Sequence, residues 1–286
     1  MKIIEKKRHI IRKAVYLCLI IFFIWVTLDN ALIHTTYTTV QLKGLPDSFS
    51  GYRIVQVSDL HNNMYGINQS YLISRIKAAN PDIIVITGDL VDRNTADVDN
   101  AMAFVSRAVE IAPVYYVSGN HEASVLNEYM ELMIRMGKAG VNELDNKAVS
   151  LNSKDGAVIL AGIRDPAFDW SNTSVAIADS QIKKVLEGFD RDKATILLSH
   201  RPELLKTYSE NSIDLVLTGH AHGGQVRLPF IGPIYSPSQG LFPKLTSGLY
   251  SEGETQMYVS RGIGNGIAPF RFNDGPELAV IILQPA

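Results

Sequence analysis

The sequence has little cysteine and little net charge, and each shortage excludes a class of protein. Its 286 residues include one cysteine, Cys18, so no intrachain disulfide can form and a disulfide-stapled scaffold is excluded. The 27 basic residues nearly balance the 29 acidic ones, and a net charge of −2 gives no electrostatic case for nucleic-acid binding. No internal repeat is visible. With 46% hydrophobic and 20% charged residues, the composition excludes chain-wide disorder, collagen and coiled coil.

The N-terminal segment differs from the remaining chain in charge and hydropathy. Residues 1–30 hold six basic and two acidic side chains, and an apolar run covers 14–28 and resumes at 31–33. A membrane-spanning helix needs about 20 apolar residues, so this run is of borderline length. The basic residues precede it, which places the N-terminus in the cytoplasm and the following chain on the far side of the membrane. We therefore predict a basic tail and transmembrane signal-anchor over 1–35.

Two alternatives to an uncleaved anchor stay open. A cleaved signal peptide has the same charged start, but the small residues that a cleavage site needs are poorly represented over 27–31. A buried core helix is also apolar, although six cations in front of it would be unusual. Under the anchor interpretation the protein is a single-pass protein of the cell membrane with an extracytoplasmic domain over 36–286.

After the anchor, β-rich runs alternate with helical patterns. Apolar runs predict strands, and apolar residues at helical spacing predict helices over 68–79, 101–109, 126–136, 182–189 and 202–208. The predicted strands cover 53–57, 82–87, 114–117, 147–151, 157–162, 194–198, 213–218, 225–228, 256–260 and 277–283. This order favours an α/β domain with two β-sheets between helices. Proline and glycine crowd a long loop over 229–248, for which an apolar lid that contacts lipid and a simply packed loop are both open.

Polar residues that can bind metal follow five of the apolar strands. Ligands of open α/β sheets bind outside the carboxyl ends of their strands, where these side chains would converge. Five of the seven histidines take part, and so many buried polar groups need a partner such as two divalent cations. The strand-end residues are Asp59, His61, Asp89, Asn120, His121, His200, His220 and His222.

These segments resemble the calcineurin-like metallophosphoesterases over about residues 50–283. The matching motifs, in order, are Asp59-x-His61, Gly88-Asp89, Gly119-Asn-His-Glu122, His200 and Gly219-His-x-His222. Residues 223–229 and 260–264 look like the membrane-associated or exported bacterial branch, the YkuE- and YaeI-like proteins. The resemblance implies a four-layer α-β-β-α sandwich with two mixed sheets, preceded here by one transmembrane helix.

The resemblance also implies two divalent metal ions, and mixed imidazole and carboxylate ligands suit Mn, Zn or Fe. The first ion would take Asp59, His61, Asp89 and His222, and the second would take Asp89, Asn120, His200 and His220. His121 would be the catalytic residue, as a general acid or by orienting the phosphate. Glu122 would support a histidine or the backbone. Arg201 would pair with Glu203 or face solvent in preference to phosphate.

Three functional interpretations follow. The first is a membrane-anchored phosphoesterase that hydrolyses phosphodiesters or phosphomonoesters with a metal-bridging hydroxide, on lipid-linked or envelope-linked substrates. The second is a dinuclear metal hydrolase of another bond, such as an amide, because metals polarise carbonyls equally well. The third is a non-catalytic scaffold, which would be expected to lack ligands, although none is missing here.

Overall fold

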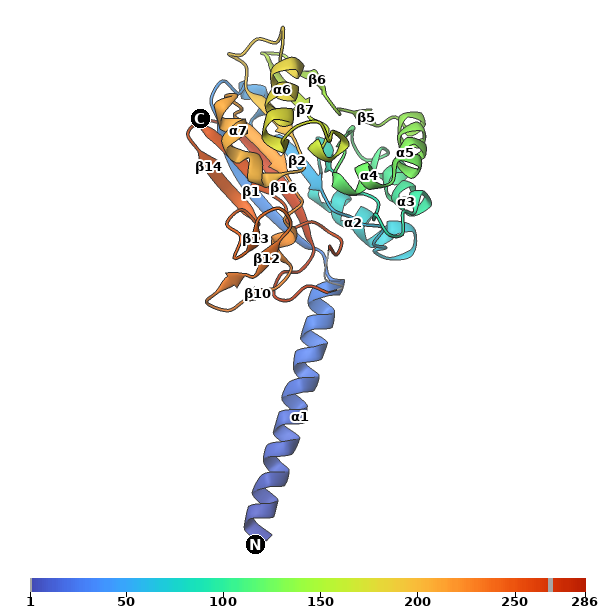
Figure 1. Cartoon of the computed structure of the whole chain (residues 1–286), viewed down its shortest axis with the longest axis vertical. Coiled ribbons are helices and arrows are strands. Elements are labelled where there is room, and N and C mark those ends of the chain that lie inside the picture. The colour runs from blue at the N-terminus through green and yellow to red at the C-terminus, as the bar shows by residue number, and fades with distance from the viewer. Residues whose placement is uncertain (1, 267–269) are drawn as a thin grey trace.

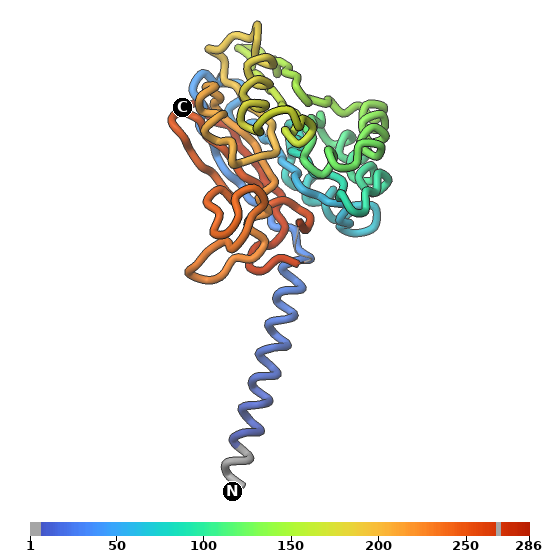
Figure 2. The backbone as a smooth tube through the Cα atoms, in the orientation of Figure 1, coloured from blue at the N-terminus to red at the C-terminus, as the bar shows by residue number. Residues whose placement is uncertain are grey.

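A computed structural model describes residues 2–266 and 270–286 of the chain. The predicted segments 1–35 and 36–286 include Met1 and residues 267–269, which lie outside the described residues. One long helix, α1 (Lys2–Ala31), projects away from a folded α/β domain (Figures 1 and 2). An 18-residue stretch within Lys7–Ala31 has a mean hydropathy of 2.1 and none of that stretch is buried, so α1 is a candidate membrane span by length and composition.

The first sheet contains both the first and the last strand of the domain. Its strand order is β1 (His34–Leu42), β16 (Glu277–Pro285), β2 (Arg53–Val57), β3 (Ile83–Thr87), β4 (Val114–Val117) and β5 (Asn142–Glu143). β2 to β5 are parallel to one another, whereas β16 is antiparallel to β2 and parallel to β1. The sheet is therefore mixed, as expected.

The second sheet has the same number of strands. Its order is β14 (Gly248–Glu252), β15 (Thr255–Val259), β9 (Leu215–Thr218), β8 (Thr195–Leu198), β7 (Ala157–Gly162) and β6 (Lys147–Asn152). The four central strands are parallel, and the two edge strands are antiparallel to their neighbours. Two small hairpins lie outside both sheets: β10 (Arg227–Leu228) with β11 (Gly232–Pro233), and β12 (Tyr235–Ser236) with β13 (Gly240–Leu241).

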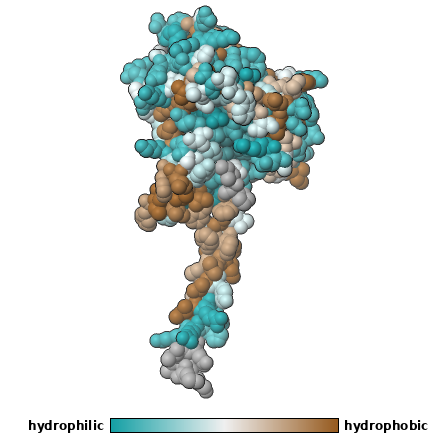
Figure 3. Space-filling view, in the orientation of Figure 1, coloured by the Kyte–Doolittle hydropathy of each residue, from teal (hydrophilic) through white to brown (hydrophobic). Residues whose placement is uncertain are grey.

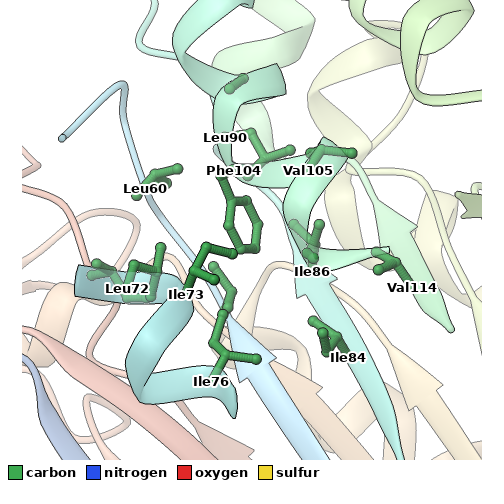
Figure 4. Packing of buried hydrophobic residues seen from close by; sticks show 14 of the residues in the cluster. Leu60, Leu72, Ile73, Ile76, Ile84, Ile86, Leu90, Phe104, Val105 and Val114 are labelled. Atoms are coloured by element: carbon green, nitrogen blue, oxygen red, sulfur yellow. The ribbon is translucent and has the colours of Figure 1, made fainter. Parts of the chain in front are cut away.

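Helices cover the outer face of each sheet, which gives the predicted four layers. α2 (Ser70–Ala79), α3 (Val98–Ala108) and α5 (Leu126–Ala139) pack on the first sheet through the core shown in Figure 4. A second core joins the two sheets, and a third joins the second sheet to α6 (Ser174–Val185) and α7 (Leu205–Glu210). The short α4 (Asn120–Ser124) follows β4. Short 3₁₀ turns cover Asp47–Phe49, Ile67–Gln69, Pro166–Phe168, Pro202–Leu204 and His222–Gly224.

Several elements differ from the sequence prediction. No strand was predicted over His34–Leu42 or over Gly248–Glu252, and the predicted loop over 229–248 contains most of the two hairpins. β1 and β14 are both edge strands, each paired on one side only within the described residues. α6 begins at Ser174, eight residues before the predicted helix, because the Thr173 hydroxyl caps it by accepting a hydrogen bond from the amide of Ala176.

Candidate metal centre

The carboxyl ends of five parallel strands bring all eight predicted residues to one place between the two sheets. Seven of the eight side chains are buried, and Asn120 is half-buried. Asp59 and His61 follow β2, Asp89 follows β3, Asn120 and His121 begin α4 after β4, His200 follows β8, and His220 and His222 follow β9.

The first group of possible metal ligands contains Asp59, His61 and His222. The Nε2 atoms of the two histidines face each other at 3.2 Å, and Oδ1 of Asp59 lies 3.4 Å from Nε2 of His222. One ligand atom from each of the three residues lies within 4.8 Å of the others. This spacing leaves room for a single cation between them.

The second group contains Asp89, His200 and His220, again with ligand atoms within 4.8 Å of one another. Nε2 of His200 lies 3.2 Å from Oδ2 of Asp89 and 3.2 Å from Nδ1 of His220. The same Oδ2 atom of Asp89 is 3.7 Å from Nε2 of His61 in the first group. Asp89 therefore lies between the two groups, where a bridging ligand would be needed.

The backbone at these strand ends adopts an uncommon conformation. Five of the strand-end residues have positive φ angles between 47° and 64°, a region that side chains other than glycine rarely occupy. Such conformations cost free energy and persist where the surrounding structure enforces them, often at functional sites. The five residues are Asp59, His61, Asp89, His220 and His222.

Neighbouring groups hold the ligands in place. Glu122 accepts hydrogen bonds from the backbone amides of Asp89 at 2.9 Å and Gly119 at 2.8 Å, so it supports the backbone. The Nδ1 atom of His200 lies 2.8 Å from the carbonyl oxygen of Thr87. Donation from Nδ1 to this carbonyl fixes the tautomer in which Nε2 of the neutral ring carries a lone pair toward the site.

Burial determines most of the charges in the cluster. It lowers the pKa of His61 to about 3 and the pKa of His222 well below its usual value, so both rings are neutral. Burial raises the pKa of Asp59 to about 6. Burial also disfavours the charged form of His200, but the nearby carboxylate of Asp89 outweighs it and raises the pKa of His200 to about 10. The neutral rings of His61 and His222 thus lie beside the carboxylate of Asp59 across short gaps, and a cation bound at Asp89 would take the place of the proton on His200.

One orphaned atom gives a separate test of whether metal ions fit. Oδ1 of Asn120 is buried and has no hydrogen-bond partner within residues 2–266 and 270–286. A buried polar atom without a partner costs free energy that coordination would recover, and Oδ1 of Asn120 is a predicted metal ligand. The imidazole, carboxylate and amide donors present here suit Mn, Zn or Fe.

His121 lies at the open side of the cluster, with two residues that sequence reasoning missed. Nδ1 of His121 is 3.5 Å from Oδ2 of Asp92, and the Arg93 guanidinium approaches Nε2 to 2.7 Å. The three residues line a cleft of about 320 Å³ together with Asp89 and Asn120. The sequence held one signal that could have found Asp92 and Arg93: they follow Asp89 by only three and four residues.

Two further contacts come from loops that no strand-end pattern could reveal. Oγ of Ser238, between β12 and β13, lies 3.0 Å from Nε2 of His220. The fully buried Arg271 places a guanidinium nitrogen 3.4 Å from Nδ1 of His222.

Arg201 forms ion pairs, with Glu203 as the sequence favoured and more closely with Asp165, which it did not indicate. Its guanidinium contacts both carboxylate oxygens of Asp165, at 2.8 and 3.0 Å, and lies 3.3 Å from Glu203.

Comparisons with known proteins agree with this geometry. Residues 52–224 match the family model described as calcineurin-like phosphoesterase. The uncharacterized metallophosphoesterase YkuE of Bacillus subtilis is 32% identical over 268 residues, which cover 90% of this chain and 87% of that protein. Phosphodiesterase YaeI of Escherichia coli is 27% identical over 83% of this chain and 84% of its own.

Two more matches bear on the anchor and the fold. A bovine transmembrane protein with a metallophosphoesterase domain is 30% identical over 91% of this chain and 60% of its own. Among solved structures, TT1561 of Thermus thermophilus superposes with a TM-score of 0.51 at 16% identity, covering 75% of this chain and 92% of that one. The second match supports the fold alone.

Proposed function

Because the chain belongs to the calcineurin-like phosphoesterase family, and is thus a metal-dependent phosphoester hydrolase, we propose that its strand-end cluster is a dinuclear centre. The observation that carries the proposal is the cluster's complete and inward-facing donor set. Asp89 lies between two groups of ligands, and the buried Oδ1 of Asn120 lacks a partner within the described residues.

The proposed division of ligands follows the two groups. Asp59, His61, Asp89 and His222 would hold the first ion, and Asp89, Asn120, His200 and His220 would hold the second. When bound, two divalent ions polarise phosphoryl oxygens and lower the pKa of water, so that a hydroxide nucleophile is available near neutral pH. Ser238 and Arg271, which lie beside His220 and His222, would keep these two rings in position.

The side chains at the cleft would bind and orient the phosphoester. The Arg93 guanidinium has the planar donor geometry that pairs with phosphoryl oxygens. Burial lowers the pKa of His121, and the neighbouring Arg93 lowers it further, so the ring is neutral near neutral pH. Phosphate bound at Arg93 would offset that cation's charge and favour a proton on His121, which the ring would then give to the leaving group.

The location of the substrate is the second part of the proposal. α1 would anchor the chain in the cell membrane with the domain on the extracytoplasmic side, and the substrates would be lipid-linked or envelope-linked phosphoesters. The apolar, unburied α1 supports the anchor, as does the bovine relative whose name describes it as transmembrane. The name of YaeI makes phosphodiesters the first compounds to test.

The test measures metal content and hydrolysis on the purified full chain in detergent. We expect two ions per chain after Mn²⁺ loading, and hydrolysis of a generic phosphodiester or phosphomonoester. His61→Ala and Asp89→Asn should each lower the metal content and abolish hydrolysis. His9→Ala provides the matched control, because His9 is an exposed histidine on the N-terminal half of α1, the helix that projects away from the domain.

Three results would contradict the proposal. Full metal content and activity in the His61 and Asp89 variants would show that these residues are not ligands. Two ions with hydrolysis of amides alone would favour the non-phosphate hydrolase. A chain that binds no metal even after Mn²⁺ loading would favour the scaffold.

A further inference from the structure

The two small hairpins expose an apolar surface that the described part of the domain does not cover. In this hairpin surface, residues 228–243, the side chains of Phe230 and Leu241 are 109% and 68% exposed, and those of Ile231 and Phe242 are 60% and 64% exposed. The segment contains no charged residue, whereas Arg227 and Lys244 flank it on either side. An exposed apolar patch of this kind marks an interaction site.

The hairpin surface lies beside the end of α1. Phe272 packs edge-on against Trp25 of α1, with ring centroids 5.5 Å apart. Phe22 of α1 also packs against the ring of Phe272. Through its backbone, Phe272 forms a β-bridge with Val226, and its carbonyl accepts a hydrogen bond from the amide of Arg227, the first residue of β10. Figure 3 shows the resulting apolar surface at the end of the domain from which α1 projects.

The C-terminal end of α1 is also held to the domain by hydrogen bonds. Nδ2 of Asn30 donates to the carbonyl of Arg271 at 2.8 Å, and the amide of Arg271 donates to Oδ1 of Asn30 at 2.6 Å. The hairpin surface and α1 are therefore joined through Arg271 and Phe272 on one side of the domain. If α1 spans a bilayer, Trp25 lies near the last turns of the span, where aromatic residues mark the membrane–water interface.

The inner side of the same hairpins reaches the candidate metal centre. Ser238 connects β12 to β13 and contacts His220, and the adjacent Pro237 lines the cleft that holds His121. A surface that rested on the bilayer would thus hold the cleft beside the lipid headgroups.

From this juxtaposition we propose that the hairpin surface inserts its apolar tips into the bilayer that α1 spans. The proposal rests on the membrane anchor of the proposed function and adds a second, interfacial contact to it. The occupant is lipid because the surface is uncharged, flanked by cations that suit anionic headgroups, and continuous with the anchor. The site then receives phosphoester groups of membrane-bound molecules at the level of the headgroups.

The test places spin labels on the full chain in lipid nanodiscs that contain anionic phospholipid. In a Cys18→Ser background, single labels replace Phe230, Leu241 and, as the matched control, Ile134, which is 58% exposed on α5 away from α1. Oxygen partitions into lipid and a nickel chelate stays in water. We expect the ratio of oxygen to nickel accessibility to be several-fold higher at positions 230 and 241 than at 134.

The native Cys18 separates failure of this inference from failure of the anchor. A label on Cys18 reports whether α1 is in the bilayer. If Cys18 is in lipid while position 230 matches position 134, the hairpin inference is wrong and the anchor stands. If Cys18 is aqueous, both are wrong. A label at position 230 could instead be shielded from both reagents, with its spectrum broadened by a nearby second label. That result would show that another copy of the chain covers the surface, and it would also overturn the proposal.

Discussion

Gly219 lies directly before His220 and packs closely against two buried side chains, those of Ser58 and Asp59. A Cβ atom there would lie 1.9 Å from Oγ of Ser58 and 2.3 Å from Oδ2 of Asp59. Both side chains are buried and held by other contacts, so Gly219→Ala must displace the Asp59 carboxylate. We expect fewer bound ions and a loss of about 100-fold in hydrolysis, since a shift of about 1 Å in a site can cost that much.

Gly137 offers the matched control for this substitution. A Cβ atom at Gly137, near the end of α5, meets no atom of the described residues within 4 Å. Gly137→Ala should leave hydrolysis unchanged and raise the free energy of unfolding by up to about 1 kcal/mol, the difference in helix propensity. Equal activity in the two alanine variants would mean that the close approach at Gly219 does not hold Asp59.

The residues of the site could be predicted to different extents. Asp59, Asp89 and His200 each follow an apolar strand, and the carboxyl ends of parallel strands must meet, so sequence order alone indicates their proximity. Ser238 and Arg271 reach the histidines from loops, and their positions depend on long-range folding that no local pattern encodes.

Among the elements, Asp145 links α5 to the chain that follows β4. Its carboxylate accepts hydrogen bonds from the amide and hydroxyl of Ser118, at 2.8 and 2.6 Å, and from the hydroxyl of Tyr129 at 2.9 Å. Burial nevertheless raises the pKa of Asp145 to about 6, compared with about 3.9 for an unfolded chain. Between these pH values the folded chain binds more protons than the unfolded chain does.

Loss of the proton from Asp145 makes the folded chain less stable as pH rises. As pH rises from about 4 to about 6, Asp145 lowers the free energy of unfolding by up to about 3 kcal/mol. Asp145→Asn removes this titration, so its stability relative to wild type should improve steadily across that window. Urea unfolding of wild type and of Asp145→Asn, each as the full chain in detergent, measures the difference in stability. The carboxylates of the metal centre titrate in both proteins, so their contributions cancel in that difference. A difference that stays constant with pH would contradict the prediction.

The elements themselves were predictable where burial leaves a pattern in the sequence. β3 is buried at all five positions, so it appears as a continuous apolar run and was predicted to within one residue. β1 is rich in threonine and has few apolar residues, because much of this edge strand is exposed. Its partner β16 lies over 200 residues away, so only the folded sheet shows the pairing.

At the scale of the whole molecule, α1 and the domain are stabilised differently. The domain buries apolar side chains in three cores among the described residues, whereas the apolar run of α1 over residues 14–28 is exposed apart from the half-buried Val26. Apolar surface left in water on such a helix costs free energy in proportion to its area. The anchor proposal resolves this cost by placing α1 in lipid, and the charges around it then set its direction.

The orientation of the chain can be tested by labelling single cysteines in spheroplasts that express it. Six basic residues precede the apolar stretch, and the next basic residue after it is Lys43, so the positive-inside rule places the N-terminus in the cytoplasm. In a Cys18→Ser background, a membrane-impermeant maleimide should label Trp170→Cys, at a side chain that is 92% exposed, in intact spheroplasts. It should label His9→Cys only after lysis. The opposite pattern would reverse the orientation, and a labelled domain released from the membrane would indicate a cleaved signal peptide.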